Sequence, residues 1–257
     1  MKVAMLNDST KCMACRGCQT ACKQWNNLPA QPTRFTGSYE NPPSLSPVTW
    51  TRIMFREHEN EGKTRWLFTK MHCMHCQDAP CVDVCPSGAM HKTDRGTVKV
   101  DAQKCISCNY CVANCPFLVA QYDKSMGVAR KCTFCYDRVT HGMQPACAAT
   151  CPTEAIVFGE RGEIVRKAQE RVRELKARGV RGARVYGLDE MGGMGMIHVL
   201  ADRPSACGLP DEPQAPAGAT VWGNIFKPLR VLAVAGVVAL GLVINRRRAR
   251  EQDPGRS

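Results

Sequence analysis

One stretch decides the fold of this chain: Cys12-Met13-Ala14-Cys15-Arg16-Gly17-Cys18-Gln19-Thr20-Ala21-Cys22. Three of its cysteines follow one another with two residues between them, and the fourth comes after a gap of three. In runs of this spacing the first three cysteines hold one iron–sulfur cluster, and the fourth holds a second one. A tight loop can aim three sulfurs at one face of a cubane, and a short helix then carries the fourth sulfur away. The stretch therefore predicts a pair of iron–sulfur clusters and a second cysteine block elsewhere in the chain.

Three further blocks vary the same design. They are Cys73-x2-Cys76-x4-Cys81-x3-Cys85-Pro86, then Cys105-x2-Cys108-x2-Cys111-x3-Cys115-Pro116, and finally the looser Cys132-x2-Cys135-x11-Cys147-x3-Cys151-Pro152. The third block, like the first, has the spacing of bacterial ferredoxins. Together the blocks use sixteen of the seventeen cysteines, and they predict four 4Fe–4S clusters. Cys207 lies outside every block, and we expect it to be a plain thiol.

The ligands of each cluster follow if paired blocks exchange their remote cysteines, as ferredoxins do. Blocks two and three are close in sequence, so we expect them to form an inner module at about 65–118, inserted into an outer module at about 1–30 and 120–160. The inner module gives two ligand sets: Cys73, Cys76, Cys81 and Cys115, and then Cys85, Cys105, Cys108 and Cys111. The outer module gives the other two: Cys12, Cys15, Cys18 and Cys151, and then Cys22, Cys132, Cys135 and Cys147.

Zinc and disulfides are the alternatives for so many cysteines. A zinc ribbon uses two Cys-x2-Cys pairs separated by a loop, and three cysteines within seven residues cannot all serve one tetrahedral ion without strain. A disulfide framework leaves one of the seventeen cysteines unpaired, and a chain of 257 residues rarely needs disulfides to supplement its core. His72 directly precedes the second block and His75 lies within it. Both are candidate ligands, but we expect them to tune or flank a cluster because four cysteines are already present there.

The charge of the chain bears on nucleic acid as a partner. Its formal net charge of +12 would by itself suit nucleic-acid binding. However, a 4Fe–4S cluster with four thiolates adds roughly −2, so four clusters contribute about −8. Part of the remaining balance lies in one C-terminal run, Arg246-Arg247-Arg248-Ala249-Arg250. We therefore expect no nucleic-acid partner.

Short strands and one amphipathic helix are expected around the cysteine blocks, which gives an α+β class with two interleaved ferredoxin-like modules. The expected strands are 48–55, 65–69, 96–100, 155–158, 183–186 and 196–200, and 28–47 is an extended connection rich in proline. The helix runs over 162–178, with Ile164, Ala168, Val172 and Leu175 at helical spacing. The glycine-rich turn at 192–195 lacks the G-x-G-x-x-G arrangement, so we do not interpret it as a nucleotide site.

The C-terminal part changes in composition after the cluster domain, 1–207. Residues 208–221 are rich in proline, alanine and glycine and indicate a linker. Residues 222–245 contain a long uncharged run and predict a transmembrane helix, since the 23 residues from Trp222 to Ile244 span about 34 Å as a helix. Lys227 and Arg230 could extend toward the headgroups. The alternative is a buried core helix at the end of the domain.

The orientation of this expected anchor follows from its flanking charges. The basic tail, 246–257, should face the cytoplasm, because positive flanks stay inside. The cluster domain would then lie on the other side of the inner membrane, in the periplasm of a two-membrane bacterium. No cleavable signal peptide is expected, since Asp8 comes before an apolar segment can form. Such a domain would cross already folded, carried by the signal of a partner.

The whole chain resembles the iron–sulfur (beta) subunits of molybdopterin or tungstopterin oxidoreductases, and among them most the subunit of respiratory, membrane-bound formate dehydrogenase. The residues that carry this resemblance are Cys12–Asn26 with Leu28-Pro29, His72–Cys76 with Pro80-Cys81, Lys131–Arg138, and Trp222 through Lys227-Pro228-Leu229 into the apolar run. Nitrate reductase relatives place tryptophan where this chain has Cys108, so four complete cubanes are expected here. Soluble formate dehydrogenase subunits lack the anchor.

The resemblance implies a non-catalytic electron-transfer subunit of a membrane complex in anaerobic respiration. A catalytic pterin–metal subunit would oxidise formate, and a membrane cytochrome b subunit would reduce quinone, with the anchor in contact with membrane lipid. The alternative within the class is the equivalent subunit of a dimethyl sulfoxide, polysulfide or thiosulfate reductase, with electrons running the other way. From other classes, a stand-alone polyferredoxin and a zinc–thiolate module remain open.

Overall fold

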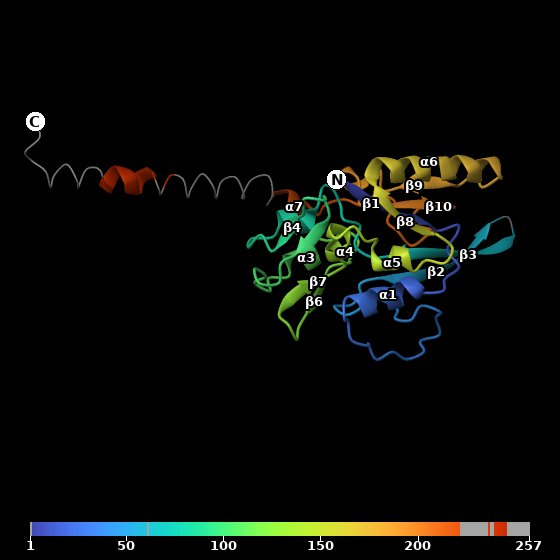
Figure 1. Cartoon of the computed structure of the whole chain (residues 1–257), viewed down its shortest axis with the longest axis horizontal. Coiled ribbons are helices and arrows are strands. Elements are labelled where there is room, and N and C mark those ends of the chain that lie inside the picture. The colour runs from blue at the N-terminus through green and yellow to red at the C-terminus, as the bar shows by residue number, and fades with distance from the viewer. Residues whose placement is uncertain (1, 61, 222–235, 237–238, 246–257) are drawn as a thin grey trace, which may run out of the picture.

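A four-stranded sheet closes one side of the domain and brings the two ends of its chain together. The computed structural model describes residues 2–60, 62–221, 236 and 239–245, and Figure 1 shows the sheet beneath the long helix. Its strands are β1 (Val3–Asp8), β8 (Ile156–Glu160), β9 (Arg184–Tyr186) and β10 (Met196–Leu200), in the order β8-β1-β10-β9. β1 runs parallel to β10 and antiparallel to β8, and β9 runs antiparallel to β10.

The long helix α6 (Arg161–Ala177) covers one face of this sheet. Its apolar stripe is buried, as expected from the helical spacing, against alternate residues of the two central strands. The buried residues of this layer include Ala4, Leu6, Ile164, Ala168, Val172, Leu175, Ile197 and Val199. Side chains alternate across a strand, so Met5 and Met196 point to the opposite face and into the main core. The sheet therefore separates the helix layer from the cysteine-bearing part of the molecule.

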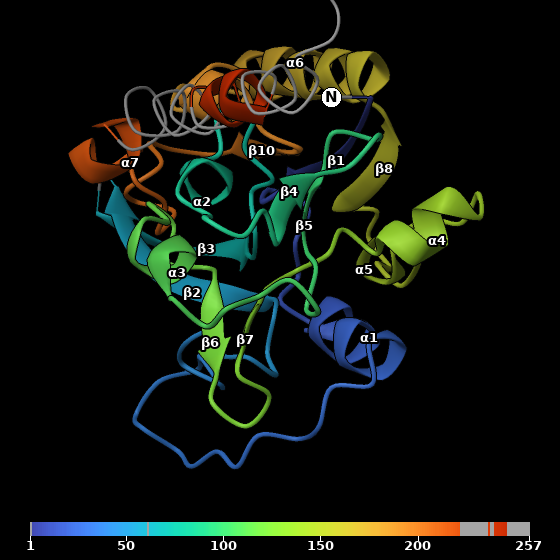
Figure 2. The same cartoon turned by 90° about the vertical axis from the view of Figure 1, so that its left-hand side faces the viewer.

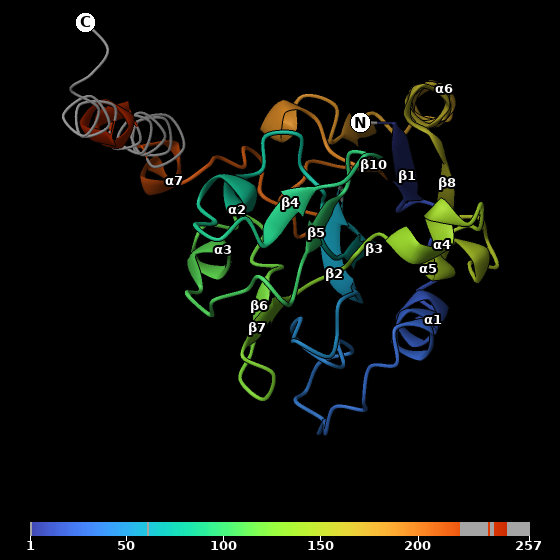
Figure 3. The ribbon, with the colours of Figure 1, turned by 60° about the vertical axis from the view of Figure 1, so that its left-hand side comes forward.

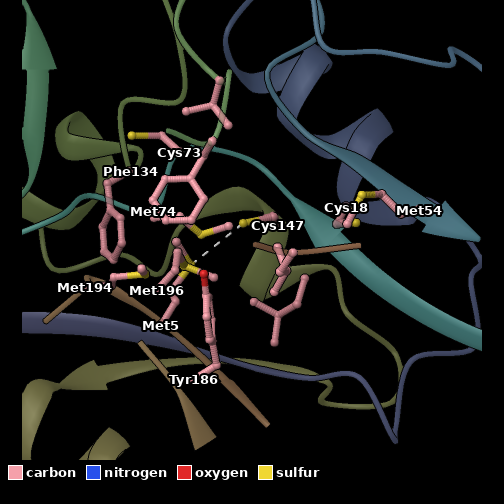
Figure 4. Close-up of a cluster of buried hydrophobic side chains, with 14 of the residues drawn as sticks. Met5, Cys18, Met54, Cys73, Met74, Phe134, Cys147, Tyr186, Met194 and Met196 are labelled. Carbon is pink, nitrogen blue, oxygen red and sulfur yellow. Dashed lines mark hydrogen bonds between the residues drawn. The ribbon is translucent and has the colours of Figure 1, made fainter. Parts of the chain in front are cut away.

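The main core is rich in sulfur and aromatic side chains (Figure 4). Met5, Met74, Met194 and Met196 are all at most 1% exposed, and Phe134 lies among them. Methionine is unbranched and polarisable, so it fills the irregular space between loops that pack without regular secondary structure. Cysteine loops from distant parts of the chain meet here.

The rest of the domain consists of three hairpins and several short helices. The hairpins pair β2 (Arg52–Asn60) with β3 (Lys63–Met71), β4 (Met90–Lys92) with β5 (Val98–Val100), and β6 (Gln121–Asp123) with β7 (Val128–Arg130). The short helices are α1 (Gly17–Trp25), α2 (Pro80–Asp83), α3 (Tyr110–Ala113), α4 (Tyr136–Thr140), α5 (Ala146–Ala149) and α7 (Ala217–Val221), with a 3-10 turn at Glu190–Gly192. α1 packs beside α5 and α2 beside α3, as Figures 2 and 3 show on two sides of the domain.

The expected helix and the expected strands are confirmed, within a few residues at their ends, by α6, β2, β3, β5, β8, β9 and β10. The segment expected as a linker, 208–221, contacts the domain near its start and is mostly exposed over 211–218. Leu209 is 2% exposed, and the hydroxyl of Tyr186 donates to the carbonyl oxygen of Pro210 at 3.0 Å. The end of the segment forms α7, which contacts α2.

The predicted transmembrane helix, 222–245, falls mostly outside the described residues, as does the basic tail, 246–257. Within the part of the chain that the structure describes, no helix combines the length and the apolar character needed to cross a membrane. Residues 239–245 are described and helical. Four of them expose large apolar side chains: Leu240, Leu242, Val243 and Ile244.

Candidate iron–sulfur cluster sites

Each cysteine loop turns on a residue with a left-handed backbone. The residue just before the second cysteine of every block has a φ between 51° and 62°: Ala14, His75, Ser107 and Phe134. This conformation costs residues other than glycine roughly 1–2 kcal/mol. It also turns successive backbone N–H groups into a concavity that suits anions, including iron–sulfur clusters. The loops are thus shaped to surround an anionic group at the expense of local strain.

Short helices carry cysteines from one loop to the next site. α1 holds Cys18 and Cys22, four residues and about one turn apart. α2 holds Cys81 and ends just before Cys85, α3 holds Cys111 and ends just before Cys115, and α5 holds Cys147 and ends just before Cys151. The two cysteines at each helix lie about one turn apart along its axis, so they can reach different sites. The packing of α1 on α5 and of α2 on α3 then makes the exchange of cysteines reciprocal.

Four cavities result, and each is lined by four cysteines. The first is lined by Cys12, Cys15, Cys18 and Cys151, the second by Cys22, Cys132, Cys135 and Cys147, the third by Cys73, Cys76, Cys81 and Cys115, and the fourth by Cys85, Cys105, Cys108 and Cys111. Each leaves between 310 and 360 Å³ free of protein atoms, open solvent at the mouth included. The structure thus brings together the same four groups of cysteines that the spacing predicts as ligand sets.

The chemistry of these cysteines fits a metal cluster. Burial raises the pKa of Cys18 and of Cys22 to about 12, and that of Cys111 and of Cys135 to about 11. Such thiols keep their protons at neutral pH unless a metal takes their place. Among the described residues, no three His, Cys, Asp or Glu side chains come together around a single ion; the cysteines surround a larger space instead. That arrangement suits a group of several atoms.

The cavities follow one another in a row. Cys18 of the first is close enough to Cys147 of the second for their charges to interact. In the same way Cys132 of the second approaches Cys73 of the third, and Cys81 of the third approaches Cys111 of the fourth. The sequence of sites along the molecule is therefore first, second, third and fourth.

His72 and His75 are fully buried beside the second cysteine block. The Nδ1 atom of His75 accepts a hydrogen bond from the backbone N–H of Val98 at 3.0 Å, and its ring lies edge-on to Phe134 at 4.9 Å. Burial, helped by nearby positive charge, lowers the pKa of both histidines well below its usual value. Neither is among the described residues that line the four cavities, so both flank the sites as neutral side chains.

Cys207 is fully buried in the main core and lines none of the four cavities. Burial raises the pKa of this thiol to about 11. Its surroundings are those of a small apolar side chain, which is how a buried free cysteine behaves.

Two buried lysines at the sites were not singled out from the sequence. Lys70, at the end of β3, lines both the first and the second cavity, and Lys131, just after β7, lines the third. Burial alone would lower the pKa of both, but nearby cysteine thiolates outweigh it and raise that pKa. A lysine also precedes the first cysteine of other blocks, at Lys11 and Lys104, where it is exposed. The sequence therefore carries no signal that separates a buried lysine from an exposed one.

Comparison with known proteins agrees with this arrangement. Models of the 4Fe-4S dicluster domain match residues 11–89 and 64–161. The nitrate-inducible formate dehydrogenase iron-sulfur subunit of Escherichia coli K12 is 42% identical over 95% of this chain and 84% of its own length. The formate dehydrogenase iron-sulfur subunit of Haemophilus influenzae is 38% identical over 92% of this chain and 78% of its own. The thiosulfate reductase electron transfer subunit of Salmonella typhi is 39% identical over 62% of this chain and 76% of its own.

Proposed function

This chain belongs to the iron–sulfur subunits of formate dehydrogenase, with four 4Fe–4S clusters and a role in electron transfer, and from that premise we propose its place in a complex. It receives electrons from a catalytic pterin–metal subunit that oxidises formate. It delivers them to a membrane cytochrome b subunit that reduces quinone. The chain itself is not catalytic, since its cysteines serve the clusters and not a substrate.

The row of four cavities is the observation that carries this proposal. We assign the four cysteines of each cavity as the ligands of one cluster, which supplies a one-electron acceptor and donor when bound. Reciprocal exchange through the short helices keeps neighbouring sites at a fixed spacing. A row of such sites suits the passage of electrons across a protein.

The protein around each site would set its reduction potential. Backbone N–H groups already point at ligand sulfurs: that of Met90 donates to Cys85 Sγ at 3.3 Å, and that of Phe134 to Cys132 Sγ at 3.4 Å. Hydrogen bonds to sulfur, burial and nearby charge are the means by which a protein tunes such clusters. The left-handed residue Phe134 supplies one of these hydrogen bonds from the backbone alone.

We further propose that residues 222–245 anchor the subunit in the inner membrane, in contact with lipid, with the tail, 246–257, in the cytoplasm and the cluster domain in the periplasm. The exposed apolar side chains at Leu240, Leu242, Val243 and Ile244 support this, since a row of them in water is unfavourable. The four arginines that follow favour a cytoplasmic tail.

The second candidate is the matching subunit of a thiosulfate reductase. It is favoured by the identity of 39% to the Salmonella subunit, although that match covers 62% of this chain. The formate dehydrogenase subunits match more than nine-tenths of it. The longer match favours the formate dehydrogenase assignment.

The test is anaerobic purification of the chain together with the proposed pterin-binding and haem subunits. We expect about sixteen iron and sixteen sulfide per chain, as four 4Fe–4S clusters require, and formate-dependent reduction of a quinone analogue. Iron and sulfide without formate activity, but with quinol-dependent reduction of thiosulfate, would favour the second candidate. Absence of sulfide would contradict the cluster assignment itself.

A further inference from the structure

Lys70 lies inside the protein between two cluster sites. The residue is 1% exposed, at the end of β3, and it lines the first and the second cavity together. Among the described residues it is the only charged one that lines the second cavity, and it shares the first with Arg16. One ammonium group is therefore common to two neighbouring sites.

Lys131 has the corresponding place at the next step of the row. It is 4% exposed and, in the part of the chain that the structure describes, is the only charged residue that lines the third cavity. Its Nζ atom donates to the carbonyl oxygen of Val98 at 2.5 Å and to that of Cys132 at 3.1 Å, so the ammonium is held near a cysteine of the second site as well. In contrast, none of the described residues that line the fourth cavity is charged.

Neither ammonium forms an ion pair with a carboxylate of the described residues. Within the described part of the chain, the ion pairs of lysine and arginine with carboxylates involve other residues. A buried charge is costly unless an opposite charge or strong hydrogen bonds offset it. The cysteines beside Lys70 are Cys18, Cys22, Cys132 and Cys147, and those beside Lys131 are Cys73, Cys81 and Cys132. Anionic clusters at these cysteines would supply the missing charge.

We propose that Lys70 and Lys131 are fixed cations that raise the reduction potentials of the clusters beside them. The inference deepens the proposed function and rests on its ligand assignment. Reduction adds one electron and no proton to a cluster, so its negative charge grows while the ammonium stays in place. In a dry interior the attraction between the two is strong, and it favours the reduced cluster. Lys70 acts on the first and second clusters, Lys131 on the third and to a lesser degree on the second, and the fourth has no such cation.

The experiment is a redox titration of the anaerobically purified complex at one fixed pH, followed by electron paramagnetic resonance. Lys70→Met should lower the midpoints of two of the four clusters, with at least a tenfold smaller equilibrium constant for reduction, which is about 59 mV for a one-electron couple. Lys131→Met should lower the midpoint of the third cluster by a similar amount, and that of the second cluster by less. Lys70→Arg, which keeps the charge, should leave the midpoints near those of the unaltered protein.

Lys104→Met is the matched control for Lys131→Met. Lys104 also directly precedes the first cysteine of a block, but its side chain is 66% exposed, where water screens its charge. Its loss should leave all four midpoints unchanged. Equal shifts in the Lys104 and Lys131 variants would overturn the inference, as would unchanged midpoints in Lys70→Met.

Iron and sulfide content separates this inference from the ligand assignment. If the clusters are present and the midpoints do not move, only the role of the lysines is wrong. If the unaltered protein lacks the four clusters, the ligand assignment is wrong. Should Lys70→Met fail to bind its clusters, Lys70→Gln and Lys70→Arg are compared; equal midpoints in that pair would refute a role for the charge.

Discussion

Ala14 shows how one residue joins backbone strain to the shape of a cluster loop. Its φ of 57° lies in the left-handed region, which a β-branched side chain tolerates least. We expect Ala14→Val to destabilise the loop by about 1–2 kcal/mol, which corresponds to roughly 5- to 30-fold faster loss of iron to a chelator. Ala14→Gly should slow that loss or leave it unchanged. Met13→Val is the control, since Met13 is 60% exposed and its φ is not among the positive ones; an equal effect there would argue against backbone strain.

The exchange of cysteines between blocks can be tested by comparing the iron content of single and double cysteine variants. Cys22 and Cys135 come from different blocks but line the same cavity, whereas Cys22 and Cys15 share a block but line different cavities. Cys22→Ala should cost about one cluster, or four irons per chain. The double variant with Cys135→Ala should lose no more iron than Cys22→Ala alone. The double variant with Cys15→Ala should lose about twice as much iron. Iron analysis decides this, and the reverse order of losses would show that each block keeps its own cluster.

At the scale of elements, sequence reasoning missed β1 together with the three-residue strands β4, β6 and β7, and β1 is the one that belongs to the main sheet. All six of its residues, Val3–Asp8, are buried, so they show none of the alternation that marks a half-buried strand. Its polar end is bound by one nearby residue and by two distant ones. The backbone N–H of Thr10 donates to Asp8 Oδ1 at 2.9 Å. The side-chain amide of Asn7 donates to Nδ1 of His198 at 3.2 Å, and Nε of Arg171 donates to Asp8 Oδ2 at 2.8 Å. Helix α6, in contrast, could be predicted, because its apolar residues recur with a helical period and its opposite face is polar and exposed to solvent.

Helix α6 packs on the face of the sheet that is turned away from the cluster sites. A substitution in this helix should therefore change the stability of the domain without changing the clusters. Ile164 is fully buried in that layer. Ile164→Ala should lower the free energy of unfolding by about 2–5 kcal/mol and lower the melting temperature of the anaerobic protein. Iron content and the four midpoints below that temperature should stay unchanged. Arg173→Ala, at an exposed position of the same helix, should change neither. Loss of iron in Ile164→Ala at low temperature would mean that the layer supports the sites directly.

At the scale of the whole molecule, cysteine spacing predicted which distant segments meet, and the structure gathers the same four groups of four cysteines. Spacing is informative here because each block is local and the exchange rule links the blocks in pairs. The order of the sites along their row and the burial of the two lysines could not be predicted. They depend on how the inner hairpins pack against the outer helices, and that packing leaves no periodic trace in the sequence. Lys131 and Lys104 occupy the same place relative to a cysteine, yet only the fold buries one of them.

Removal of residues 222–257 tests whether the C-terminal segment is an anchor or part of the domain. Since α7 packs on α2 and ends at Val221, a chain cut after that residue keeps every described contact of the cluster domain up to α7. We expect the shortened chain, produced without partner subunits, to appear in the soluble fraction with about sixteen irons, while the full chain sediments with membranes. A core helix would behave differently, because its removal would expose apolar surface and lower both solubility and iron content. A shortened chain that still sediments with membranes, fully loaded with iron, would place the membrane contact on the cluster domain itself.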